Sequence, residues 1–354
     1  MITDMEVCCE CNRLNFQRLN QKQLRADLYS GLQDAMGAGM EENVNQLGRQ
    51  IILSSSFIGS PRHMHQQYQD AMAICRHFGK PDFFITFTCN PEWKEIQDAL
   101  PPGFKAEDAP TLVSRVFHKK LDALLTDLLK NGVLGKAIAH VYVIEFQKRG
   151  LPHAHLLLIL RAEDKVHTVE DIDGVISAEI PDSDTDPELY RIVTQNMLHG
   201  PCTPQRCLKN GRCSKKYPKP FSNETVWHDD GYPLYRRQDN GRTILIRGKV
   251  YDNQWVVPFN PYLSKQYNAH IDVELCSTVR AFKYLYKYVY KGLDRATVAF
   301  SVNQDANNVP PENNEIGQYI DSRYIGPCEA AWRIGQFEMH GRNPAICRLQ
   351  VFFI

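Results

Sequence analysis

The chain has 354 residues, of which 43% are hydrophobic and 23% charged, and 41 basic side chains balance 41 acidic ones. The apolar content is enough to bury a core, which excludes a disordered chain, and the zero net charge excludes a uniformly basic nucleic-acid coat. No secretory signal, transmembrane run or Gly-x4-Gly-Lys-Ser/Thr phosphate loop is recognised, so we expect neither a membrane partner nor an ATP-driven helicase.

Residues 1–79 are predicted to form a helical N-terminal region. Ser60 and Pro61 suit the N-cap and the first position of a helix, because a serine oxygen satisfies a free backbone N–H and proline has none to satisfy. This helix would carry Met72 and Ile74 toward the core.

A β-rich segment runs from Phe83 to Cys89 and ends at Asn90-Pro91, where the chain must turn. Thr86 and Thr88 share one face of this predicted strand and would line the floor of a site beside it. An amphipathic stretch from 112 to 130 then separates it from the next strand.

Two histidines, His153 and His155, stand one residue apart at the start of an apolar run. Side chains two positions apart on a strand point to the same face, so these imidazoles converge while Ala154 turns to the core. The stretch 140–147 is also strand-like, and the glycine and proline that follow it favour a short turn. We therefore predict an antiparallel hairpin.

Folding back of this hairpin brings Glu145 or Gln147 beside the histidines. Two neutral imidazoles and one carboxylate make a three-ligand site with open positions, as a catalytic metal requires. Glu145 is the preferred third ligand, and Gln147 stays open because amide oxygens also bind hard cations such as Mg²⁺ and Mn²⁺. The alternative is an ordinary histidine pair at a strand end.

A long insertion is expected from about 162 to 269. Residues 163–188 are strongly acidic and are expected to be exposed and mobile. From 199 to 222 there is no acidic residue, and the cations that gather there indicate a phosphate-binding patch. These cations are Arg206, Lys209, Arg212, Lys215, Lys216 and Lys219.

A second basic cluster surrounds the turn-like residues 239–241, where a DNA-binding hairpin and an ordinary solvated hairpin are both open. Its members are Arg236, Arg237, Arg242, Arg247 and Lys249.

The same insertion carries one imidazole and three thiols in a Gly/Pro-rich loop, namely His199, Cys202, Cys207 and Cys213. Tetrahedral zinc accepts these ligands and would organise a basic loop that lacks a core, and reduced loop cysteines are the alternative. The other cysteines are scattered without a disulfide-like framework, which indicates a reducing compartment.

Tyrosines and lysines alternate over residues 283–291. Read as a helix ending at Gly292, this segment places Tyr284 and Tyr288 on one face and Tyr286 and Tyr290 on a roughly opposite one. A stripe of cations flanks the first pair: Lys283, Lys287 and Lys291. A strand stays open, as does simple core packing of the rings.

Together these two motifs indicate phosphoryl transfer. A phenol has a pKa of about 10 and is a poor nucleophile at neutral pH. It can attack a phosphodiester when a metal neutralises the phosphate oxygens and a cation stabilises the phenolate. The product is a covalent phosphotyrosine and a free hydroxyl on the other DNA end. An ordinary metal hydrolase that uses water is a further alternative.

The order of the strand at 83–89, the His-x-His strand and the two-tyrosine segment resembles the HUH endonuclease domain of Helitron rolling-circle transposases. The resemblance covers nearly the whole chain. It includes shorter stretches, which are residues 25–35, 48–62, 68–73, 199–202 and 217–219.

The resemblance implies an α+β fold with a mainly antiparallel central sheet and flanking helices. It implies Mg²⁺ or Mn²⁺ held by His153, His155 and Glu145, and Tyr284 and Tyr288 as nucleophiles assisted by Lys291. Single-stranded DNA is the implied partner, and we expect it to contact a set of cations: Lys283, Lys287, Arg149, Lys215 and Lys216.

The expected organisation has five parts: a helical region (1–79), the first part of the nuclease core (80–161), the insertion (162–269), the tyrosine helix (270–294) and a C-terminal segment (295–354). Family members continue into a helicase, so unwinding would come from a domain or protein supplied elsewhere. We expect the end at Ile354 to reflect a truncated gene, a separate nuclease fragment or a decayed element. A nuclear location follows from the function, and an inactive DNA-binding remnant is the rival interpretation.

Overall fold

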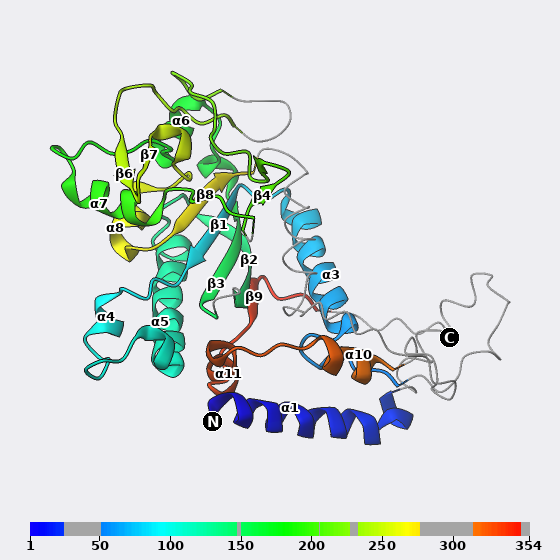
Figure 1. Cartoon of the computed structure of the whole chain (residues 1–354). Helices are drawn as coiled ribbons and strands as arrows, with labels where there is room; N and C mark the ends of the chain where they lie inside the picture. The colour runs from blue at the N-terminus through cyan, green and yellow to red at the C-terminus, as the bar shows by residue number, and fades with distance from the viewer. Residues whose placement is uncertain (25–50, 147–149, 205, 227–232, 277–313, 348–354) are drawn as a thin grey trace.

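The computed structural model describes residues 1–24, 51–146, 150–204, 206–226, 233–276 and 314–347 (Figure 1). Its centre is a five-stranded sheet with the order β8-β1-β3-β2-β9, in which every neighbouring pair is antiparallel. Helices flank this sheet, which confirms the predicted α+β class.

The strands of the sheet are β1 (Phe83–Thr88), β2 (Ala137–Phe146), β3 (Pro152–Leu160), β8 (Ile271–Leu275) and β9 (His340–Asn343). The predicted hairpin is β2–β3, with Glu145 directly opposite His153. β3 is the central strand and is buried along its whole length, because β1 and β2 flank it and other parts of the chain pack on both faces of the sheet. The two outer strands, β8 and β9, come from later parts of the chain than the three inner ones.

One face of the sheet packs on α5 (Pro110–Leu129), the helix expected at 112–130. The rings of Phe87 and Phe117 stack there with centroids 5.2 Å apart, and both side chains are fully buried. Trp332 closes the same cluster, also fully buried. Burial of each such aromatic ring contributes on the order of 2–3 kcal/mol, so this cluster anchors the fold.

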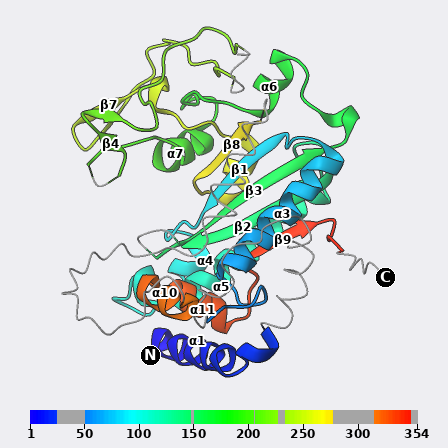
Figure 2. The same cartoon turned by 90° about the vertical axis from the view of Figure 1, so that its right-hand side faces the viewer.

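The opposite face is covered in part by α3 (Pro61–Phe78), which begins as predicted: the Ser60 hydroxyl accepts a hydrogen bond from the backbone N–H of His63 at 3.0 Å. Ile74 on this helix is buried against Val141, Leu157 and neighbouring apolar residues of the sheet. Figure 2 shows α3 running along this face. Its apolar contacts occupy one end of the sheet and leave the other end for polar side chains.

The N- and C-terminal segments meet below the sheet (Figure 1), where α11 (Pro327–Ile334) packs between α5 and α1 (Ile2–Leu19). Here α10 (Glu315–Ser322) contributes Tyr319, whose hydroxyl donates to Glu10 at 2.6 Å. Arg323 donates to both Glu10 and Glu329. This buried network joins α1 to α10 and α11, which lie near the other end of the sequence. The remaining elements of this region are α4 (Lys94–Gln97) and the 3-10 turns Ala106–Asp108 and Ala162–Asp164.

The insertion forms a small layer of its own (top of Figure 1) around a core that includes Val193, Met197 and Phe259. Its helices are α6 (Val169–Val175), α7 (Pro187–Asn196) and α8 (Pro261–Tyr267), with the 3-10 turn Asn253–Trp255. Its hairpins are β4 (Leu208–Lys209) with β5 (Arg212–Cys213), and β6 (Ile244–Ile246) with β7 (Lys249–Tyr251).

The acidic segment is not the isolated exposed insertion that its composition predicted, because its carboxylates pair with cations from the second basic cluster and from α8. Arg236 lies 3.3 Å from both Asp173 and Glu179. Two further pairs are Arg242 with Asp182 at 2.7 Å and Lys265 with Asp186 at 2.6 Å.

The DNA-facing alternative for the second basic cluster is wrong for Arg237, which is only 2% exposed. Its Nη1 donates to the backbone carbonyls of Ala178, Asn253 and Val256. A charged group with these three acceptors is satisfied inside the insertion, so it organises the fold and is not available to DNA.

The contact between α3 and β9 is expected to make stability depend on pH. The His63 and His340 rings lie 5.1 Å apart, and burial, with His63 and Arg342 nearby, lowers the pKa of His340 to about 4. An unfolded histidine titrates near ~6.5. Above that pH the neutral His340 ring makes its full contribution to the free energy of unfolding. This contribution is lost as the pH falls toward 4, because in this range the unfolded chain binds the proton and the folded chain does not.

We expect His340 alone to lower the free energy of unfolding by about 2 kcal/mol between roughly pH 6.5 and 4.5. Urea unfolding across this window should show a shallower pH dependence for His340→Gln than for the parent chain. His167→Gln, at an exposed position, is the control. Equal slopes for the parent and His340→Gln would contradict the prediction.

Candidate functional site

Polar side chains gather on the α3 face of the sheet, beyond the apolar contacts of that helix. Directly opposite residues of antiparallel strands share a face, so the register lines them up in rows. One row joins Glu145, His153 and Thr88 across β2, β3 and β1. The next row joins His155, Thr86 and Asp272 across β3, β1 and β8. The site is therefore assembled from four strands.

The two histidines lie together at the buried beginning of β3, with ring centroids 4.5 Å apart and ring planes at 84°. His153 Nδ1 is hydrogen-bonded to Thr88 Oγ1 at 2.7 Å. His155 Nε2 lies 3.5 Å from Glu145 Oε2, and its ring stacks on Phe84 with centroids 5.7 Å apart. The structure thus brings together all three residues of the preferred metal set.

The protonation state of His153 follows from its surroundings. Burial lowers the pKa of this imidazole well below its ordinary value, and His155 and His270 act in the same direction. The ring is therefore neutral at neutral pH. Thr88 occupies Nδ1, which leaves Nε2 as the nitrogen that can bind a cation.

In donor chemistry these residues suit a divalent metal, although their ligand atoms do not converge as closely as those of His199, Cys202, Cys207 and Cys213. A buried neutral imidazole with one ring nitrogen already hydrogen-bonded is the usual form of a histidine ligand. A second imidazole and the Glu145 carboxylate lie beside it. This mixture of nitrogen and oxygen donors suits Mn²⁺, and Mg²⁺ when water completes the shell. The alternative ligand, Gln147, lies outside the described residues.

The sequence interpretation missed Asp272 and Glu274. Burial raises the pKa of Asp272 well above its usual range, with Glu274 adding to the shift, and Oδ1 of Asp272 has no hydrogen-bond partner among the described residues. The alternation of apolar and acidic residues over 271–275 indicates a strand with both acids on one face. It gives no sign that this strand lies beside β1.

The predicted nucleophile segment lies outside the described residues, and so does one predicted DNA contact. The first group is Tyr284, Tyr288 and Lys291 with Lys283 and Lys287, and the second is Arg149. Their assignments stay predictions.

The four residues of the predicted zinc set are brought together in the insertion. One ligand atom from each of His199, Cys202, Cys207 and Cys213 lies within 4.8 Å of all the others. His199 Nε2 is 3.5 Å from Cys207 Sγ and 3.3 Å from Cys213 Sγ. Burial, with Lys215 nearby, lowers the pKa of His199 to about 4, so its ring is neutral. This cluster can bind a metal ion.

The basic loop next to this cluster approaches the sheet. Lys215 and Lys216 are exposed. Lys215 is also close enough to Asp272 and Glu274 to counteract the rise in their pKa that burial causes. Lys249 Nζ lies 3.5 Å from the centroid of the Trp255 ring, a cation–π contact on the neighbouring hairpin. The predicted phosphate-binding patch therefore lies next to β8.

None of the described helices has the length and apolar character that crossing a bilayer requires. No curated protein matches the chain. Residues 1–158 match the family model of the Helitron helicase-like domain at N-terminus, a stretch that includes Glu145, His153 and His155. The resemblance drawn from the motifs is thereby confirmed over this stretch, which is similar to the Helitron helicase-like N-terminal family.

Proposed function

We propose that this Helitron-related chain is a metal-dependent single-stranded DNA endonuclease and strand transferase that forms a covalent 5′-phosphotyrosine intermediate. The observation that carries the proposal is the convergence of His153, His155 and Glu145 on one polar end of the sheet. An apolar strand face does not need two buried imidazoles and a carboxylate, whereas a cation site does.

Each side chain of the site has a distinct role in this proposal. His153, through Nε2, would hold the cation together with His155 and Glu145, and Thr88 keeps the His153 ring in place. Bound Mg²⁺ or Mn²⁺ supplies positive charge that polarises the phosphodiester. Phe84 fixes the His155 ring by stacking, so the two imidazoles are positioned before DNA arrives.

The chemical step uses Tyr284 or Tyr288. The phenol oxygen attacks phosphorus, a new P–O bond to tyrosine forms, and the bond between phosphorus and the 3′ oxygen breaks. The phenol loses its proton and the departing 3′ oxygen gains one, which leaves a free 3′ hydroxyl. Lys291 stabilises the developing phenolate. A later hydroxyl reverses the step, and the second tyrosine allows one strand to be held while another is cut.

The single strand would reach the site along the predicted DNA-binding cations. Lys215 and Lys216 on the basic loop would contact its phosphates, as would Arg149, Lys283 and Lys287. Unwinding would come from a helicase domain or protein supplied elsewhere, and this work on DNA would take place in the nucleus.

We further propose that Zn²⁺ occupies the cluster of His199, Cys202, Cys207 and Cys213. The specific observation is the convergence of one imidazole and three thiols around the small β4–β5 hairpin. This hairpin has two residues in each strand and little core of its own. A tetrahedral zinc would supply the missing stabilisation and hold the basic loop against the sheet.

The decisive experiment is a denaturing gel of labelled single-stranded DNA incubated with the protein and Mn²⁺. We expect a protein-linked band that survives in Tyr284→Phe or Tyr288→Phe but is lost in the double variant. Tyr324→Phe, at an exposed tyrosine, is the control.

Two other outcomes of this experiment would favour the alternative functions. Cleavage without a linked band, unchanged by the tyrosine variants, would favour a hydrolase that uses water. Binding of DNA in a native gel with no cleavage of any substrate would favour the inactive DNA-binding remnant.

A further inference from the structure

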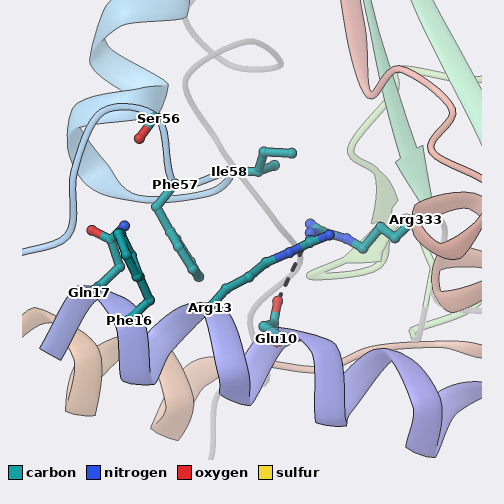
Figure 3. A pocket seen from close by; sticks show the side chains of 8 residues that line it. All are labelled: Glu10, Arg13, Phe16, Gln17, Ser56, Phe57, Ile58 and Arg333. Carbon is teal, nitrogen blue, oxygen red and sulfur yellow. Dashed lines mark ion pairs between the residues drawn. The ribbon is translucent and has the colours of Figure 1, made fainter. Parts of the chain in front are cut away.

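A pocket of about 300 Å³ opens between α1, the loop that precedes α3, and α11, away from the histidine site (Figure 3). Arg13 enters it from α1 and Arg333 from α11, and Figure 3 shows their guanidinium groups pointing toward one another above Glu10. Two like charges that face each other across a cavity repel, and Glu6 and Glu10 on α1 offset part of this repulsion. An anion bound between the two guanidinium groups would offset the rest.

Arg333 is the anchor of the pocket. The residue is 8% exposed, and its Nε donates to Glu329 Oε1 at 2.9 Å. Its Nη2 is buried and has no hydrogen-bond partner among the described residues. Leaving a buried charged donor without an acceptor is energetically costly, so a ligand oxygen at this place would be stabilised.

The carboxylate in the pocket does not fill this role. Glu10 Oε1 accepts hydrogen bonds from Tyr319 at 2.6 Å and from Arg323 at 3.2 Å. Its distance to Arg333 Nη1 is 4.0 Å, at the limit of an ion pair. Arg13 is exposed and forms no ion pair with any other described residue. Both guanidinium groups thus have donors left for an anion with several oxygens, and phosphate matches that requirement.

The other wall of the pocket is aromatic and apolar. Phe16 is 61% exposed on α1, so its ring is accessible to a ligand. Phe57 is buried beside it and is held edge-on against Tyr319, with centroids 5.2 Å apart. A flat exposed ring next to two guanidinium groups is the combination that binds a nucleobase and its phosphate.

We propose that this pocket binds one nucleotide, with its phosphate between Arg13 and Arg333 and its base against Phe16. The nucleotide is either free in solution or part of a DNA strand, since the recognised chemistry is the same. The pocket uses none of the residues that hold the metal or attack DNA, so the inference does not depend on the proposed function.

The test is isothermal titration of the full chain with three probes: deoxyadenosine monophosphate, inorganic phosphate and a short oligodeoxyadenylate. Arg13→Gln is expected to weaken binding of the nucleotide by about tenfold or more. Arg18→Gln is the matched control, because it removes the same charge from the same exposed helix outside the pocket. Its effect should stay below about twofold.

A second variant separates the base from the phosphate. Phe16→Ala is expected to weaken the nucleotide but not inorganic phosphate. An effect of Arg13→Gln on the monophosphate supports a free nucleotide, and an effect on the oligonucleotide alone supports a nucleotide within a strand. Lack of binding by every probe, or equal losses for Arg13→Gln and Arg18→Gln, would overturn the proposal. The chain with His153→Ala should bind the monophosphate like the parent, whatever the fate of cleavage.

Discussion

Replacing His155 with alanine is expected to slow DNA cleavage by on the order of a hundredfold or more while DNA binding is retained. The substitution removes one of two adjacent imidazoles and leaves Glu145, 3.5 Å away, without its neighbour. Cleavage should be measured in a single turnover with Mn²⁺, and the affinity for Mn²⁺ should be measured separately by paramagnetic resonance. The cleavage rate and the Mn²⁺ affinity should fall together, because His155 is proposed to hold the metal that cleavage requires.

The control for this prediction is His167→Ala, which removes an exposed imidazole from the insertion. Thermal unfolding of His155→Ala shows whether the buried strand tolerates the change. Glu145→Gln adds a finer comparison, because it keeps the shape of the side chain and removes its charge. A cleavage rate and Mn²⁺ affinity in folded His155→Ala that equal those of the parent would show that the histidine pair is an ordinary feature of a strand end.

Loss of the proposed zinc from the insertion is expected to unfold the β4–β5 hairpin and the basic loop that follows it. Structural zinc sites contribute about 10–16 kcal/mol in small zinc-finger peptides at neutral pH, far more than a hairpin with two residues in each strand can supply. We expect one zinc per chain by elemental analysis of the parent and none in Cys213→Ala. Affinity for single-stranded DNA should fall with it, since Lys215 and Lys216 lie in this loop.

Cys8→Ala is the matched control, because this exposed thiol on α1 lies outside the cluster. Its zinc content and DNA affinity should match those of the parent. Full zinc occupancy in Cys213→Ala, or a parent chain that purifies without zinc and does not bind it on addition, would contradict the assignment.

Local features of the fold were predictable from the sequence. The β2–β3 hairpin follows from two strand-like runs joined by a short turn, and α3 follows from Ser60 and Pro61. The pairing of Glu145 with His153 follows from the same hairpin, because a short turn leaves few possible registers. These signals depend on residues close together in the chain, which local physics controls.

The missed features depend on contacts between distant segments. Asp272 joins the site only because β8 pairs with β1 across the whole insertion. The sequence left a DNA contact open for Arg237, because its three carbonyl acceptors lie elsewhere in the chain. The neighbour of Arg333 on another helix, Glu10, is likewise set by the docking of α1 against α11. A sequence gives the number of cationic side chains, but it does not show which of them form ion pairs or hydrogen bonds inside the folded protein.

The order of the strands also governs how the protein is made. The family match ends at residue 158, inside β3, while β8 and β9, which cover the two edges of the sheet, come after residue 270. A fragment that stops at residue 158 would expose the hydrogen-bonding edges of β1 and β2, and such edges recruit strands from other copies. At about 5–20 residues per second, a ribosome must add the insertion before β8 can close the β1 edge, and a further stretch before β9 can close the β2 edge. The insertion therefore lengthens the time during which the newborn sheet is open to aggregation.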